Sequence, residues 1–183
     1  TGTADPVAQA PDPFANPTGL MPSTSDPEHL NPDGERALRY AIGIIESTKP
    51  VNLRNRGQTL VELGDWYLAG GAPQKAVEFY RDAWKDFSAS GTPTAPLEAP
   101  RQLAYRPPSA SVNRSKLDPA IADEKRVEVA FTVTREGKTT DVHAISSEAN
   151  ESLTKSVISA VKKAKYTPRF EKGEPVDTPD VHL

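Results

Sequence analysis

The side chains that most often carry out chemistry are few and scattered in this sequence. The three histidines, His29, His143 and His182, lie far apart, and none has an acidic or histidine partner at metal-ligand spacing. There is no cysteine, which excludes disulfides, thiolate nucleophiles and cysteine-ligated zinc. Nucleophile-elbow, phosphate-loop and dinucleotide-binding motifs are also missing from the sequence. We therefore expect ordinary surface histidines, no enzyme, no cofactor and no metal site.

Charge and hydropathy limit the kinds of partner. The 183 residues carry a formal net charge of −3, which gives no general affinity for nucleic acid. No apolar run approaches the roughly 20 residues that span a bilayer. The chain begins at Thr1 rather than Met, as a processed or trimmed protein does, so we expect a missing N-terminal anchor, signal peptide or lipoprotein leader. Membrane attachment is expected only through such an anchor or a lipid.

Residues 1–34 are expected to form a disordered leader. Proline recurs throughout this segment, and proline at that density prevents both helix and interior strand. The alternative interpretation is an extended spacer. Residues 14–21 include Phe14, Leu20 and Met21, and this part could dock on the folded protein.

A helical domain is expected over residues 35–87, with three helices. The first, over 35–46, has a broad apolar face and ends before Pro50. The second covers 55–69 and is stopped by a pair of glycines. The third, over 73–87, begins with a proline, which is favoured in the first turn of a helix.

The second and third helices carry small and aromatic residues at the positions of a tetratricopeptide repeat, which the pair resembles. The matching residues are Leu60, Leu63, Gly64, Tyr67, Gly71, Ala76, Tyr80 and Ala83. Only one complete repeat is present, and a solenoid normally needs about three to bury its faces. The first helix, the C-terminal domain or another chain must therefore cap it. The concave groove of the repeat is expected to be lined by Gln58, Glu62, Asp65, Leu68 and Ala69.

Residues 88–100 combine small residues with prolines and predict a linker. A second domain is expected over 101–183. It begins with a short strand or an extended lead-in at 101–108, which its prolines confine to an edge. Residues 115–117 have the composition for one helical turn.

The stretch from Lys125 to Pro168 has the clearest pattern. Apolar and polar residues alternate over 127–133, which is the period of a half-buried strand. Gly137 can supply the positive φ of a tight hairpin, and a second strand follows over 139–146. Apolar residues then recur with the period of an amphipathic helix. The expected fold class is α+β, with an N-terminal helical hairpin followed by a small antiparallel sheet packed on a helix.

The same stretch contains a Gly-Lys turn, a strand that ends in Ser, a helix with an apolar-basic segment and a closing aromatic-x-Pro. These motifs comprise Gly137, Lys138, Asp141, Val142, Ile145, Ser146, Leu153, Val157, Ala160, Val161, Lys162, Lys163, Tyr166 and Pro168. The pattern resembles the C-terminal domain of TonB-type energy transducers. One position departs from it, since Ala164 stands where that family usually has Trp. The resemblance implies a periplasmic protein of the Gram-negative envelope.

In that family the C-terminal domain takes up an extended segment of a TonB-dependent outer-membrane receptor as an added strand. The resemblance therefore implies a partner-strand site on the last strand, formed by Val176, Asp177, Thr178, Asp180, Val181, His182 and Leu183. Pro179 lacks an amide donor and interrupts this edge. The turn at 169–172 is expected to take part as well.

A basic cluster is expected at the end of the C-terminal helix and in the turn beyond it. It contains Lys162, Lys163, Lys165, Arg169 and Lys172. We interpret it as a solvated face that compensates the helix dipole. The alternative is a contact for an acidic partner or an anionic envelope polymer.

Two functions remain open on the sequence. The first is a TonB-like protein that transduces energy or acts as an adaptor, by adding a strand from a receptor or another envelope protein. The alternative is a non-energised periplasmic binding or scaffold protein that uses the helical groove. In that case the TonB-like domain serves for docking or for forming a homodimer.

Overall fold

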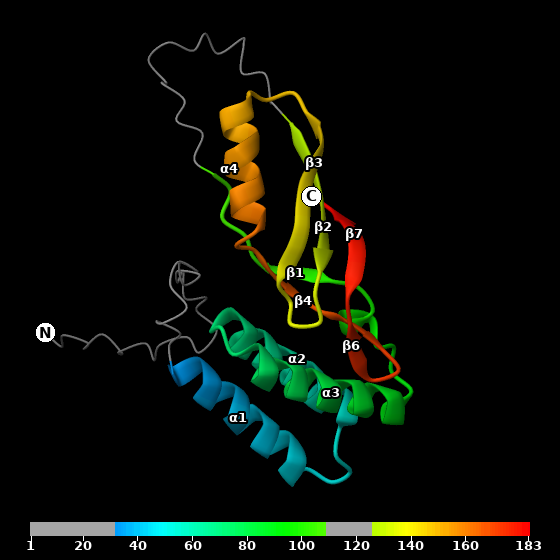
Figure 1. The fold of residues 1–183 in the computed structure, drawn as a ribbon. Helices are drawn as coiled ribbons and strands as arrows, with labels where there is room; N and C mark the ends of the chain where they lie inside the picture. The colour runs from blue at the N-terminus through cyan, green and yellow to red at the C-terminus, as the bar shows by residue number, and fades with distance from the viewer. Residues whose placement is uncertain (1–31, 109–125) are drawn as a thin grey trace, which may run out of the picture.

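The structure, a computed structural model, describes residues 32–108 and 126–183 and has an α+β architecture (Figure 1). The elements in chain order are α1 (Pro32–Ser47), α2 (Leu53–Ala69), α3 (Pro73–Ser90), η2 (Ala95–Leu97), β1 (Arg101–Ala104), β2 (Val127–Val133), β3 (Thr139–Ser147), α4 (Glu151–Val161), β4 (Lys165–Thr167), β5 (Arg169–Glu171), β6 (Glu174–Val176) and β7 (Thr178–His182). The expected fold class is confirmed. The leader, the docking of residues 14–21 and the helical turn at 115–117 lie outside the described residues. No described helix is both long and apolar enough to cross a membrane.

Small residues allow α2 and α3 to cross closely. Gly64 is buried, and a Cβ built on it would lie 2.4 Å from a ring carbon of Tyr80. Ala76 on α3 is fully buried in the same contact. Tyr67 stacks on Phe79, with ring centroids 5.3 Å apart. These two helices therefore pack as the sequence predicts, while their assignment to the tetratricopeptide repeats stays a prediction.

Two boundaries of the helical part differ from the expectation. α2 begins at Leu53, earlier than predicted, because Asn52 caps it by accepting the amide N–H of Asn55 at 3.0 Å. α3 continues to Ser90 within the segment expected to be a linker. Further along that segment Leu97 is fully buried in the helical core. The segment is therefore packed on the helices, whereas the division of the chain into domains stays a prediction.

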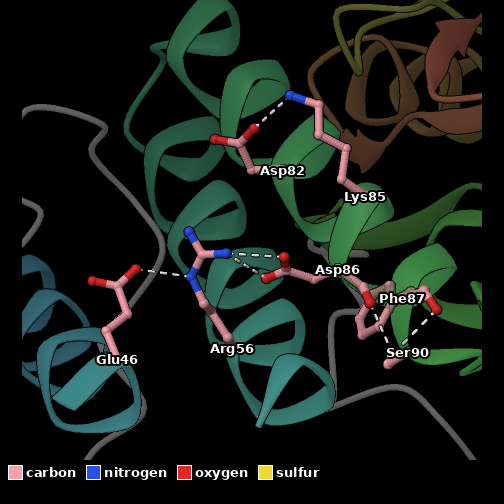
Figure 2. A network of polar contacts seen from close by, with 7 residues as sticks. All are labelled: Glu46, Arg56, Asp82, Lys85, Asp86, Phe87 and Ser90. Atoms are coloured by element: carbon pink, nitrogen blue, oxygen red, sulfur yellow. Dashed lines mark hydrogen bonds and ion pairs between the residues drawn. The ribbon is translucent and has the colours of Figure 1, made fainter. Parts of the chain in front are cut away.

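An ion-pair network joins the three N-terminal helices (Figure 2). Arg56 of α2 donates from Nε to Glu46 of α1 at 2.8 Å, and from Nη1 to the two carboxylate oxygens of Asp86 of α3 at 2.9 and 3.1 Å. Burial raises the pKa of the Asp86 carboxyl, and the neighbouring guanidinium opposes this shift. α1 has no buried residue of its own, so this network supplements the packing of Leu38 and Ile42 on the core.

The strands form three small antiparallel sheets. β1 pairs with β4, β5 pairs with β6, and the main sheet has the order β3-β2-β7. α4 packs along one face of the main sheet (Figure 1), over a core formed by Val129, Phe131, Val133, Val161, Ala164 and Tyr166. Ala164 is only 4% exposed, so the small side chain that replaces the usual Trp is fully packed here. The last strand lies at an edge of the main sheet, as expected.

The segment after β4 contains an additional hairpin. The sequence predicts a turn at 169–172, whereas the structure has two paired strands, β5 and β6, joined by a turn at Lys172 and Gly173. Lys172 and Gly173 have φ values of 51° and 87°, the left-handed pair that a two-residue hairpin turn requires. β7 consequently begins at Thr178, later than the expected residue 176.

Candidate protein-interaction site

Contacts between the helices and the C-terminal strands determine which faces stay free. Phe170 of β5 is 5% exposed and lies in the helical core, edge-on to Tyr80 with ring centroids 6.0 Å apart. At the tip of the β2–β3 hairpin, a Cβ on Gly137 would lie 3.0 Å from a methyl carbon of Leu68 on α2. The C-terminal strands therefore cover part of the helical hairpin, as Figure 1 shows.

Asp65 of α2 is the polar centre of this contact. Its carboxylate accepts the hydroxyl of Tyr80 at 2.7 Å, the hydroxyl of Thr167 on β4 at 3.3 Å and the guanidinium of Arg101 on β1. Burial, with the carboxylate of Asp65 beside it, raises the pKa of Tyr80 far above its ordinary value. One side chain thus connects α2 with α3 and with both strands of the β1–β4 sheet.

The residues predicted to line the helical groove lie in two different places in the structure. A shallow depression of about 400 Å³ is lined by Gln58, Val61, Glu62, Asp65, Pro96 and Arg101, which include three of the five predicted residues. The other two lie elsewhere, under the C-terminal part. Leu68 is 4% exposed next to the β2–β3 hairpin, and the carbonyl oxygen of Ala69 accepts Lys165 Nζ at 2.7 Å.

The five basic side chains do not share one environment. Lys162 and Lys163 are exposed just beyond α4, and Lys172 is exposed in the β5–β6 turn. Arg169 donates from Nε to the hydroxyl of Thr178 at 3.3 Å and also pairs with a neighbouring carboxylate. Lys165 is half-buried, and desolvation lowers the pKa of its amine. Lys165 binds the C-terminal end of α2 rather than that of α4, where the sequence predicts the basic cluster.

Substituting Lys165 by Ala is expected to lower the free energy of unfolding by about 1.5–3 kcal/mol, because a hydrogen bond from a charged donor to the end of α2 is lost. Lys162→Ala is the matched control, since this lysine is exposed, and should change stability by less than about 0.5 kcal/mol. Urea unfolding followed by tryptophan fluorescence measures both. Equal effects of the two substitutions would show that Lys165 does not cap α2.

The register of β7 determines which of its backbone groups are free. Val129 and Leu183 exchange two backbone hydrogen bonds of 3.0 Å each, so the amide and carbonyl of Leu183 face β2. These directions alternate along an antiparallel strand, and the amide and carbonyl of His182 therefore face away from β2. No described strand pairs with that side of β7. His182 is thus the centre of a free sheet edge.

A bulge limits this edge at its other end. The register shifts between Phe131 and Val133, because β7 has one residue more than β2 in this interval. The irregularity includes Pro179, which has no amide donor, and Asp180, whose φ is 58°. Bulges and prolines restrict pairing at sheet edges. The regular part of the free edge is therefore short.

Asp177 holds the start of β7 on the β2–β3 turn. Its Oδ1 accepts the backbone N–H of Arg135 at 2.8 Å, and its Oδ2 lies 3.4 Å from the guanidinium of the same residue. These two contacts hold the pKa of the Asp177 carboxyl below its usual range. Asp177 is therefore already bound within the chain, which makes it an anchor of the edge strand.

The register also brings two histidines into one row. Ala130 of β2 pairs with His143 of β3 on one side and with His182 of β7 on the other. Cross-strand partners share a face, so the two histidines flank Ala130 on the face opposite α4. His182 Nε2 also lies 3.0 Å from a carboxylate oxygen of Asp180. Both histidines are exposed, and only the strand register shows that they lie on either side of Ala130.

Much of the C-terminal part is similar to a known family. Residues 111–180 match the model of the family described as Gram-negative bacterial TonB protein C-terminal. This part of the chain is similar to TonB C-terminal domains. The match includes β2 through most of β7, and its first residues, 111–125, lie outside the described part. TonB C-terminal domains serve protein interaction in the Gram-negative envelope and are not enzymes. A search of curated proteins found no match to the chain.

Proposed function

We propose that this chain is a TonB-like interaction protein of the periplasm, which binds an extended segment of an outer-membrane partner as an additional strand on β7. The observation that carries the proposal is the position of β7, which pairs with β2 on one side and with no described strand on the other. The outward amide and carbonyl of His182 supply a donor and an acceptor for the added strand. The similarity of residues 111–180 to TonB C-terminal domains supports the compartment and the class of partner.

The docking of the helices fits a role in passing force. Phe170 and Asp65 connect the C-terminal strands to the helical hairpin, so a load on β7 would reach the helices through packed side chains. On this short edge the outward amide and carbonyl of His182 would carry the load from an added strand. Energy transduction is therefore part of this proposal.

Peptide binding is expected to depend on one backbone amide of β7. A synthetic peptide from the N-terminal segment of a TonB-dependent receptor should shift the amide resonances of residues 181–183 in an NMR titration. His182→Pro removes the outward N–H and should weaken binding at least about tenfold, which is the value of one hydrogen bond of about 1.4 kcal/mol. His182→Ala keeps the amide and should bind as the unmodified chain does.

The comparison of the two variants isolates the backbone contribution. Equal weakening by Ala and Pro would show that the imidazole, rather than the strand edge, makes the contact. Amide resonances at 181–183 that stay unshifted at saturating peptide would rule out strand addition on β7. Amide resonances of β2 that are the same in the free variants confirm that the sheet is intact.

A second candidate function uses the helical surface. The depression beside Gln58, Glu62 and Asp65 supports it, because Glu62 supplies a carboxylate and Val61 an apolar side chain, while Asp65 is already paired with Arg101. Such a surface suits a short segment that carries basic side chains. The chain would then be a periplasmic binding or scaffold protein, with the TonB-like domain as a docking or dimerisation unit. Peptide-induced shifts at Gln58 and Glu62, abolished by Glu62→Lys and unaffected by His182→Pro, would favour this function.

A further inference from the structure

One row of side chains crosses the main sheet on the face opposite α4. His143 and His182 flank Ala130 in this row, since both pair with it directly. Neighbouring strands lie about 4.8 Å apart, which separates the two histidine Cα atoms by about 9.6 Å across β2. Ala130 is only 3% exposed, whereas both histidines are exposed. Ala130 presents only a methyl group between the two histidines.

The hydrogen bonds of the two rings determine where their lone pairs are. His143 Nδ1 lies 2.8 Å from the backbone oxygen of Asp141. A carbonyl only accepts, so Nδ1 carries the hydrogen and Nε2 of the neutral ring has the lone pair. His182 Nε2 lies 3.0 Å from a carboxylate oxygen of Asp180, which leaves the lone pair on Nδ1 of that neutral ring. A ring nitrogen that donates to a carbonyl or carboxylate is the arrangement that orients metal-binding histidines.

We propose that His143 and His182 form a binding site for a divalent first-row transition ion, held over Ala130 between β3 and β7. Metal–nitrogen bonds of about 2.0–2.1 Å, added to the length of each imidazole, allow both rings to reach one ion across β2. Imidazole ligands suit Cu²⁺, Ni²⁺ and Zn²⁺, whereas Mg²⁺ prefers oxygen ligands.

Water is expected to complete the coordination of the ion. The described residues contain no group of three or more side chains placed to hold a metal, so the two imidazoles would be the protein ligands. The Irving–Williams order then gives Cu²⁺ the highest affinity, above Ni²⁺ and Zn²⁺. Asp180 would act by orienting His182, and the bound ion would tie the edge strand β7 to β3.

Calorimetric titration of the full chain, prepared without a histidine tag, tests the site. At neutral pH we expect one Cu²⁺ ion per chain, weaker binding of Ni²⁺ and Zn²⁺, and no binding of Mg²⁺. His143→Gln and His182→Gln should each weaken Cu²⁺ binding at least about tenfold. His29→Gln is the matched control, because His29 lies in the leader, and should leave Cu²⁺ binding unchanged.

Electron paramagnetic resonance of the Cu²⁺ complex gives a second readout. The unmodified chain should show two coordinated imidazole nitrogens, and each single variant should show one. Unchanged affinity in His143→Gln and His182→Gln, loss of binding in His29→Gln, one ion per two chains, or no Cu²⁺ binding at all would each overturn the proposal. The site uses side chains rather than the free backbone edge of β7, so its failure and the failure of strand addition are distinguished.

Discussion

Phe170→Ala is expected to lower the free energy of unfolding by about 3–5 kcal/mol, as truncations of buried phenylalanines do. Phe170 comes from the C-terminal hairpin, but it is 5% exposed inside the helical core and lies against Tyr80. Its loss therefore opens a cavity between the two parts of the chain. Trp84 of α3 lies close to the neighbouring turn, since a Cβ on Gly173 would come within 3.1 Å of its ring, and it should report the loosened contact by a red-shifted fluorescence.

Ile145→Ala is the control for this substitution. Ile145 is 49% exposed on β3, so its truncation should change stability by less than about 0.5–1 kcal/mol. Urea denaturation followed by circular dichroism measures both variants. A cost for Phe170→Ala as small as that for Ile145→Ala would show that the hairpin is not part of the helical core.

Gly137→Ala is expected to destabilise the chain by about 2–5 kcal/mol, the sum of about 1–2 kcal/mol for a left-handed alanine and about 1–3 kcal/mol for overpacking. Gly137 has φ 75°, and a Cβ on it would lie 2.2 Å from the backbone oxygen of Tyr166. The amide of Tyr166 also donates to the Gly137 carbonyl at 3.0 Å, so the two backbones cannot separate without losing a bond.

Gly91→Ala separates the two contributions to this cost. Gly91 has φ 64°, and a Cβ on it would have nothing within 4 Å. Gly91→Ala should lower the free energy of unfolding by only about 1–2 kcal/mol, because only the left-handed backbone conformation is strained. Thermal and urea unfolding of both variants measure the difference. Equal costs at the two positions would contradict the close approach of the β2–β3 turn to β4.

The single helical hairpin is stabilised by two different neighbours. From the sequence, the hairpin could be covered by the first helix, by the C-terminal domain or by another chain. In the structure α1 contributes Leu38 and Ile42 to the helical core, and the C-terminal part contributes Leu103 and Phe170. Both neighbours within the chain therefore cover the hairpin. The same packing buries part of the face that the sequence predicts to be a groove, because the β2–β3 hairpin and Lys165 of β4 lie over the end of α2.

Secondary structure was predictable wherever it depends on nearby residues. Apolar periodicity predicts β2, β3 and α4, and Gly137 has the positive φ that the hairpin pattern requires. The β5–β6 hairpin was missed because its turn includes Lys172, a residue type that rarely adopts a left-handed conformation. The resemblance to TonB-type domains also rests on such local motifs, and the match of residues 111–180 supports it.

Residue patterns alone establish the α+β class, the helices and main strands, and the family to which the C-terminal part is similar. Only the tertiary structure decided that Lys165 binds the end of α2, that Asp65 joins helices to strands, and that His143 and His182 lie on either side of Ala130. The difference lies in how far apart in the sequence the interacting residues are. Periodicity and turn conformation depend on adjacent residues, whereas strand register and docking depend on how segments distant in sequence pack together.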